Sequence, residues 1–214
     1  GCMAMRNQGR GFTLSVGSVA ERCTAEDNGD SGFWVAADST LKNCSARYND
    51  QHGFWIGWAS VLTECTAAAN VLDGFEISEG RVENCTAREN GQNGFSAKVR
   101  SQVRGCMAVN NGLHGIAAEG YCHIIGNHAT NNGVTASTGA GVYATSSGNH
   151  IEGNTCNLND LGFSIVSGDN LVIRNSARSN LLNFSFAAGT EYGQVVNNPG
   201  AGFVNTNPWA NIGF

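Results

Sequence analysis

Three side chains suited to proton transfer recur at spacings that bring them together. His52 and Asp73 are 21 residues apart, and Glu76 follows Asp73 by three residues. In a chain that coils once about every 21 residues, His52 and Asp73 occupy equivalent positions on neighbouring coils and can hydrogen-bond. An aspartate that orients a histidine can tune it as a general base. His52, Asp73 and Glu76 are therefore the candidate catalytic residues, with a purely turn-lining polar role as the alternative.

Aromatic residues lie beside this cluster. Trp34 and Trp55 each follow a Gly-Phe step and are also 21 residues apart, so we expect them to stack on neighbouring coils. Such a pair presents a flat apolar strip to a sugar ring, and Trp58 extends it. Tyr143 occupies the same column further along the chain. We expect these four aromatic residues to bind substrate; packing beneath a partner chain is an equally weighted alternative.

A second polar column contains two histidines. Gln102, His123 and His150 occupy equivalent repeat positions, and stacked imidazoles can share a metal or a proton. No carboxylate or thiol at an equivalent repeat position completes such a site. We therefore interpret the column as a polar stripe on a strand edge. We expect no metal and no cofactor.

A repeat of about 21 residues positions all of these groups. It is marked by a cysteine column that continues as asparagine, by a small residue two positions later, and by an unbroken asparagine column five positions later. Stacked asparagine amides can bond to one another at the ~4.8 Å spacing of strands. The first column is Cys2, Cys23, Cys44, Cys65, Cys85, Cys106, Asn127, Asn154 and Asn175, and the asparagine ladder is Asn7, Asn28, Asn49, Asn70, Asn90, Asn111, Asn132, Asn159 and Asn180.

Eight of the nine repeats also carry a Gly-Phe or Gly-aliphatic step followed by alternating apolar residues, as in Phe33 and Val35. The alternation is typical of a second strand, so each coil has at least two. Leu41, Cys44 and Ala46 are expected to face inward from one strand. A leucine-rich repeat shares the spacing from Leu41 to Asn49, but its core needs bulkier residues than cysteine and alanine, and it has no counterpart of the Gly-Phe strand.

The repeat unit Val-x-x-Cys-x-Ala-x-x-Asn-x-x-x-Gly-Phe resembles that of the pectate-lyase-like parallel β-helix superfamily over residues 1 to about 190. The resemblance implies an all-β, single-domain, right-handed parallel β-helix solenoid of about nine coils. It also implies an acidic or neutral polysaccharide as substrate class, without settling whether the chain is an enzyme. The paired-aspartate and Arg-x-Lys motifs of the polygalacturonase-like members and the Trp-x-Asp-His motif of pectate lyases are absent.

The eight cysteines are expected to be reduced and to pack as small hydrophobic residues, because parallel side chains in one column fit disulfide geometry poorly. A metal-binding thiolate row is the less favoured alternative, since buried thiols resist ionisation and no histidine shares the column. Cys122 lies outside the column and is the expected exposed thiol.

The composition of the chain excludes some classes of binding partner. With a net charge of -5 and only 12 Lys and Arg residues, the chain lacks the basic surface of a nucleic-acid binder. No apolar run is long enough to insert into a membrane. We expect a polysaccharide partner, an extracellular, cell-surface or periplasmic location, and an upstream domain or second subunit over the N-terminal coil.

Along the chain, we expect coils over residues 1–190, an insertion loop at 133–140 where one repeat lengthens to 27 residues, and a capping segment over 191–214 where both prolines lie. The favoured function is a carbohydrate-interacting β-helix, with a polysaccharide lyase or hydrolase as its catalytic form. The alternative is a structural or adhesive β-helix, such as a surface or tailspike-like segment, without catalysis.

Overall fold

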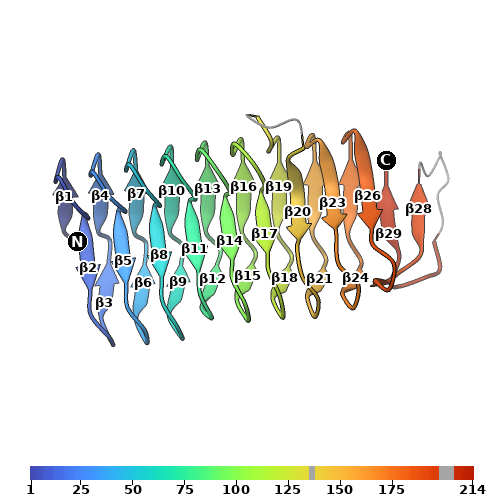
Figure 1. The fold of residues 1–214 in the computed structure, drawn as a ribbon, viewed down its shortest axis with the longest axis horizontal. Coiled ribbons are helices and arrows are strands. Elements are labelled where there is room, and N and C mark those ends of the chain that lie inside the picture. Colours follow the sequence, from blue (N-terminus) through green and yellow to red (C-terminus); the bar gives the residue numbers. More distant parts are fainter. Residues whose placement is uncertain (135–137, 198–204) are drawn as a thin grey trace.

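The computed structural model describes residues 1–134, 138–197 and 205–214. The chain coils into a parallel β-helix whose rungs stack along one long axis, with the N-terminus at one end and the C-terminus at the other (Figure 1). Three parallel sheets run the length of the solenoid, so each complete coil contributes three short strands. The predicted all-β solenoid of about nine coils is confirmed. No helix in the described residues could span a bilayer.

Sheet A contains eleven strands in the order β1-β4-β7-β10-β13-β16-β19-β22-β25-β29-β28. The small-residue column lies here and faces the core: Ala25, for example, pairs in register with Ala46. The strands are β1 (Met3–Met5), β4 (Thr24–Glu26), β7 (Ser45–Arg47), β10 (Thr66–Ala68), β13 (Thr86–Arg88), β16 (Met107–Val109), β19 (His128–Thr130), β22 (Thr155–Asn157), β25 (Ser176–Arg178), β28 (Val195–Asn197) and β29 (Asn211–Gly213).

Sheet B contains nine strands, and all of them except β26 start at or near the residue after the repeat glycine. Its inward aromatic rings stack, with the centroids of Phe33 and Phe54 4.8 Å apart, and each buried phenylalanine contributes roughly 1.5–3 kcal/mol. The strands are β2 (Phe12–Leu14), β5 (Phe33–Val35), β8 (Phe54–Ile56), β11 (Phe75–Ile77), β14 (Phe95–Ala97), β17 (Ile116–Ala118), β20 (Ala140–Ala144), β23 (Leu161–Ile165) and β26 (Leu182–Phe186).

Sheet C also contains nine strands and buries the Leu/Val/Ile column. The expectation that Leu41, Cys44 and Ala46 share one strand is wrong, because a tight corner at Cys44 separates β6 from β7. The strands are β3 (Val19–Glu21), β6 (Thr40–Lys42), β9 (Val61–Thr63), β12 (Arg81–Glu83), β15 (Gln102–Arg104), β18 (His123–Ile125), β21 (His150–Glu152), β24 (Leu171–Ile173) and β27 (Glu191–Tyr192).

Most corners turn through one residue in the left-handed region, and in the middle of the solenoid a buried polar or thiol side chain usually follows it. Asp27 with φ 56° precedes Asn28, and Asp38 with φ 57° precedes Ser39. The Asn28 side-chain amide donates to Asn49 Oδ1 at 2.9 Å, and this bond recurs along the asparagine ladder, which is confirmed. These bonds satisfy polar groups that the tight corners bury.

The repeat glycines are required by close approach and not by a left-handed conformation. A Cβ placed on Gly74 would lie 2.7 Å from the carbonyl oxygen of Gly94 and 2.8 Å from Asn90 Nδ2. The neighbouring coil therefore occupies the space that any side chain would need.

All eight cysteines are free, and the six-membered column is buried except at Cys2. Cys122 is completely buried, so its predicted exposure is wrong. It occupies a third corner column that sequence reasoning overlooked, shared with Ser39, Ser60, Ser101 and Asn149. The serine that recurs one position before four of the nine sheet C strands was the signal for that column.

The loop expected at 133–140 includes residues 135–137, which lie outside the described part of the chain, as do residues 198–204 of the expected capping segment. The flanking strands extend the solenoid. β27 pairs with β24 in sheet C, and β29 inserts between β25 and β28 in sheet A. Capping by this segment stays a prediction.

Candidate functional site

One outward column of sheet B carries most of the predicted site residues. Strand register places Trp34 beside Trp55, Trp55 beside Glu76, and Glu76 beside Ser96 on successive coils. The column continues through Ala117 to Tyr143. The side chains alternate in and out of the solenoid, so these residues share the outer surface, named here the sheet B face.

The two tryptophans stack on each other. Their ring centroids are 5.2 Å apart with an interplanar angle of 2°. Two indole rings lying side by side in one plane would have centroids further apart than this. The rings are therefore stacked face to face and do not form the flat strip expected from the sequence. The Arg10 guanidinium lies over the Trp34 ring, 4.8 Å from its centroid. The pair, half-buried, therefore offers ring edges to a ligand.

The His–Asp–Glu cluster, formed by His52, Asp73 and Glu76, lies immediately beside this pair. His52 Nδ1 is 3.7 Å from Asp73 Oδ2, and His52 Nε2 is 3.6 Å from Glu76 Oε2. The three side chains are 16%, 5% and 22% exposed. The predicted proximity is present, but the hydrogen bond expected between His52 and Asp73 is not, because 3.7 Å is too long and Nδ1 is buried without a partner in the described residues.

In each carboxylate of the cluster, one of the two oxygens accepts hydrogen bonds from a neighbouring coil. Asp73 Oδ1 accepts hydrogen bonds from the Asn93 backbone N–H at 2.8 Å and from Asn93 Nδ2 at 2.9 Å. Glu76 Oε1 accepts the Trp55 indole N–H at 3.0 Å. The second oxygen of each carboxylate faces His52. The rigid neighbouring coils thus orient both carboxylates toward the imidazole.

Burial dominates the electrostatics of Asp73. Removal of the carboxyl group from water raises its pKa, against the opposing effects of the Asn93 hydrogen bonds and of His52. The nearby carboxylate of Glu76 adds to the rise. Burial therefore disfavours the charged form of Asp73, and a proton or another cation close to the carboxyl group would offset that effect.

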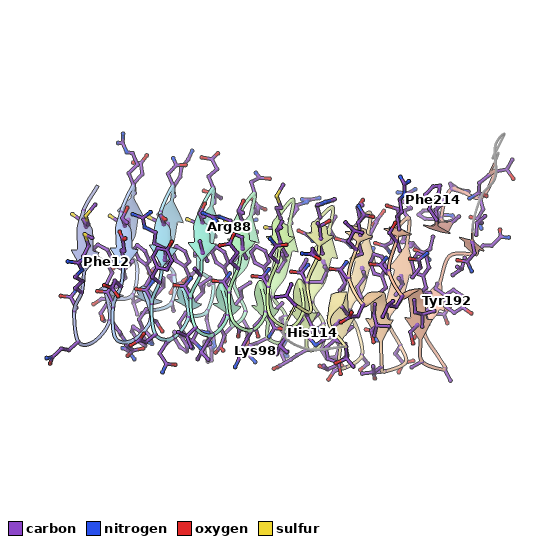
Figure 2. The ribbon with its side chains drawn as sticks, turned by 90° about the horizontal axis from the view of Figure 1, so that it is seen from above. Phe12, Arg88, Lys98, His114, Tyr192 and Phe214 are labelled. Atoms are coloured by element: carbon purple, nitrogen blue, oxygen red, sulfur yellow. The ribbon has the colours of Figure 1, made fainter. Side chains whose placement is uncertain are left out.

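A hollow of about 270 Å³ lies two coils further along the same face. It exists because Ala117 places a small side chain between Ser96 and Tyr143 in the outward column. Figure 2 shows Lys98 and His114, which both line the hollow, on the same side of the solenoid. The lining residues are Asn93, Ser96, Lys98, Leu113, His114, Ala117, Ala118, Glu119, Tyr143 and Thr145.

His114 is fixed in one state in this hollow. Its ring stacks on Tyr143 with centroids 4.3 Å apart, and its Nδ1 accepts the Ala140 backbone N–H at 3.0 Å. Burial lowers the pKa of His114 to about 4. At neutral pH the ring is uncharged and its proton is on Nε2, which makes that atom a hydrogen-bond donor.

Lys98 was not among the predicted site residues. Its ammonium group is 3.0 Å from Glu119 Oε1, and both side chains line the hollow. The signal that could have revealed them is their shared repeat position, directly after the inward residue that ends β14 and β17.

Two predicted groups lie elsewhere. Trp58 is 65% exposed in the turn between β8 and β9, outside the strands of sheet B. His123 and His150 pair in register on sheet C, with ring centroids 5.8 Å apart. Glu152 Oε2 lies 3.0 Å from His150 Nε2, so a carboxylate pairs with one histidine of this column. Glu152 follows His150 by two residues in β21, so the two side chains share the outer face of the sheet. Glu152 also accepts a hydrogen bond from Arg174.

Comparison with known proteins identifies the architecture. The family model described as the right-handed β-helix region matches residues 1–132. The A-module of a mannuronan C-5 epimerase from Azotobacter vinelandii superimposes with a TM-score of 0.69 at 20% identity, covering 81% of this chain and 56% of that one. Pectate lyase Pel9A gives a TM-score of 0.71 at 20% identity, covering 81% and 55%.

A third structure, the Dettilon tailspike protein, gives a TM-score of 0.51 at 10% identity, covering 97% of this chain and 55% of that one. No curated protein sequence matches the chain. The chain thus spans about half the length of the solved structures named here, and at these identities the likeness concerns the fold alone.

Proposed function

The chain belongs to the right-handed β-helix family, and on that premise we propose that its sheet B face binds a polysaccharide lying along the solenoid axis. The observation that carries the proposal is the bond from Trp55 Nε1 to Glu76 Oε1. It joins the stacked tryptophans and the His–Asp–Glu cluster into one continuous surface. Aromatic edges beside oriented polar groups suit a ligand with both C–H faces and hydroxyl groups.

The dimensions of the face support a chain ligand over a small molecule. Five strand steps separate Trp34 on β5 from Tyr143 on β20, which is ~24 Å at the ~4.8 Å spacing of parallel strands. The hollow beneath His114 and Tyr143 lies on the same line. Several consecutive sugar units could therefore contact equivalent positions on successive coils.

The mannuronan epimerase and the pectate lyase with this fold carry names that denote chemistry on polysaccharides. This supports a second candidate function, a reaction on the bound sugar at the His–Asp–Glu cluster. His52 lies between two carboxylates, each oriented by a neighbouring coil, and could pass a proton between the sugar and either acid. A lyase or hydrolase is the reaction class that this arrangement serves. An extracellular or cell-surface location goes with such a ligand.

The proposal is tested on a polysaccharide array read by intrinsic tryptophan fluorescence, with parallel assays for unsaturated products and for new reducing ends. A fluorescence change without product supports binding alone, and a change with product supports catalysis. Loss of the response in the Trp34→Ala, Trp55→Ala double variant, but not in Trp209→Ala at the far end of the chain, assigns it to the sheet B face. Silence across the array would favour the structural or adhesive alternative.

A further inference from the structure

The geometry points to a divalent transition-metal site of the Zn²⁺ class formed by His52, Asp73 and Glu76. One potential ligand atom from each of these side chains lies within 4.8 Å of the others. Imidazole nitrogen and carboxylate oxygen are both established ligands of such ions. Sequence reasoning considered these residues for proton transfer only and expected no metal.

Burial and charge support a cation at this place. Two carboxylates face one imidazole in a region that is mostly closed to water. The ammonium group of Lys98, on the next coil, forms its ion pair with Glu119 at 3.0 Å and is attracted to Glu76 and Asp73 only at longer range. A buried carboxylate without a compensating cation is costly, whereas a bound ion would satisfy both acids at once.

The ligand atoms are oriented before any ion binds. Asn93 holds one oxygen of Asp73 and the Trp55 indole holds one oxygen of Glu76, and in both cases the other oxygen faces the imidazole. His52 Nδ1 is buried and has no hydrogen-bond partner among the described residues. Hydrogen bonds of this kind to the ligating carboxylates fix their orientation in metal sites.

The donor set selects among ions. Ca²⁺ takes six to eight oxygen ligands, which two carboxylates and one imidazole do not provide. Zn²⁺ sites with three protein ligands keep a coordination position for an exchangeable ligand. Here that position would open toward the sheet B face, because His52 and Glu76 are partly exposed there. The column cysteines beyond Cys2 are buried and do not compete for the ion.

This inference deepens the proposed function, because an ion at the cluster would offer its open position to a hydroxyl or carboxylate oxygen of the sugar chain. The ion would bind to the same nitrogen and oxygen atoms that would otherwise transfer a proton. Metal binding and proton transfer at the cluster therefore exclude each other. Metal binding is nevertheless testable without any sugar.

The test is titration of the metal-depleted protein with Co²⁺, followed by absorbance, and with Zn²⁺, followed by calorimetry. Cys2→Ser is the background, so that no exposed thiol contributes. We expect one ion per chain and a Co²⁺ spectrum of nitrogen and oxygen ligands without thiolate charge transfer. His52→Gln, Asp73→Asn and Glu76→Gln should each weaken binding more than about tenfold.

The matched control is His150→Gln, which removes the other histidine that lies beside a glutamate, on sheet C. It should leave affinity and stoichiometry unchanged, and thermal unfolding should show that all variants are folded. Binding that survives in the three cluster variants, that is lost in His150→Gln, or that occurs with Ca²⁺ but not with Zn²⁺ would overturn the inference. Metal binding with a silent polysaccharide array would instead refute the proposed function and leave the metal site standing.

Discussion

The indole N–H of Trp55 donates to Oε1 of Glu76 at 3.0 Å, across the gap between two successive coils. This bond explains why the aromatic pair and the His–Asp–Glu cluster should respond together to a ligand. The bond joins side chains on two strands that are in register, so each side chain helps to orient the other.

The first prediction concerns the tryptophan pair. Trp34→Ala combined with Trp55→Ala should reduce retention on a binding polysaccharide at least about tenfold, because loss of buried aromatic area at a ligand contact commonly costs more than 1 kcal/mol. Affinity electrophoresis in gels containing the polysaccharide measures this. Trp209→Ala, which removes a ring stacked on Arg174, should migrate like the parent. Equal retention of all three proteins would exclude the pair from the binding surface.

The second prediction concerns His114 and pH. Its pKa in the folded protein is about 4, below its ordinary value of 6.5, so the unfolded chain binds the extra proton first as the pH falls. The stability that neutral His114 contributes is complete above pH 6.5 and is lost as the pH decreases toward 4.

His114→Asn, which keeps an acceptor near the Ala140 N–H, should therefore lose less stability than the parent over this pH range. Urea unfolding at several pH values measures the difference, and the exposed His123→Asn variant is the control. Parallel pH profiles for parent and His114→Asn would contradict the assigned burial.

The third prediction concerns the asparagine ladder. The Asn90 side chain accepts from the backbone N–H and the amide of Asn70, and donates to Asn111 Oδ1 and to the Ala67 carbonyl. Asn90→Ala should lower the free energy of unfolding by about 3 kcal/mol, because several buried groups lose their partners. Asn7→Ala, at the exposed end of the ladder, should cost far less. Similar denaturation midpoints for both variants would show that the ladder contributes little.

The fourth prediction concerns close packing at the repeat glycine. Gly74→Ala should destabilise the protein by about 2 kcal/mol or more, because the added Cβ would clash with the Gly94 carbonyl and the Asn90 amide. Gly9→Ala has open space around the new atom and should be nearly neutral. Thermal unfolding of both variants checks the contrast, which disappears if the coils can separate at no cost.

The fifth prediction concerns the thiols. In the native protein, a thiol reagent should react rapidly with Cys2 and slowly with the other seven cysteines, all of which are buried. Denaturant should expose all eight. Cys2→Ser should abolish the fast phase, and Cys122→Ser should leave it unchanged. A fast phase that depends on Cys122 would restore the exposure expected from the sequence.

The repeat alone determined the architecture and the shared columns of this protein. A strict spacing of about 21 residues places equivalent side chains on successive coils, and the two-residue alternation of strands decides which of them face outward. The stacking order from Trp34 through Trp55 to Glu76, and the neighbouring positions of His52 and Asp73, therefore follow from residue numbers. The asparagine ladder follows in the same way.

Only the tertiary structure decided what happens at the corners and across the face. Repeat spacing does not reveal where a coil bends, so the strand predicted through Cys44 was split and the buried corner at Cys122 was missed. It does not set ring orientation or atom distances either: the two tryptophan rings stack nearly parallel, and His52 Nδ1 lies 3.7 Å from Asp73 Oδ2, too far for a hydrogen bond. Side-chain torsions and contacts between coils determine these details, and a linear pattern contains neither.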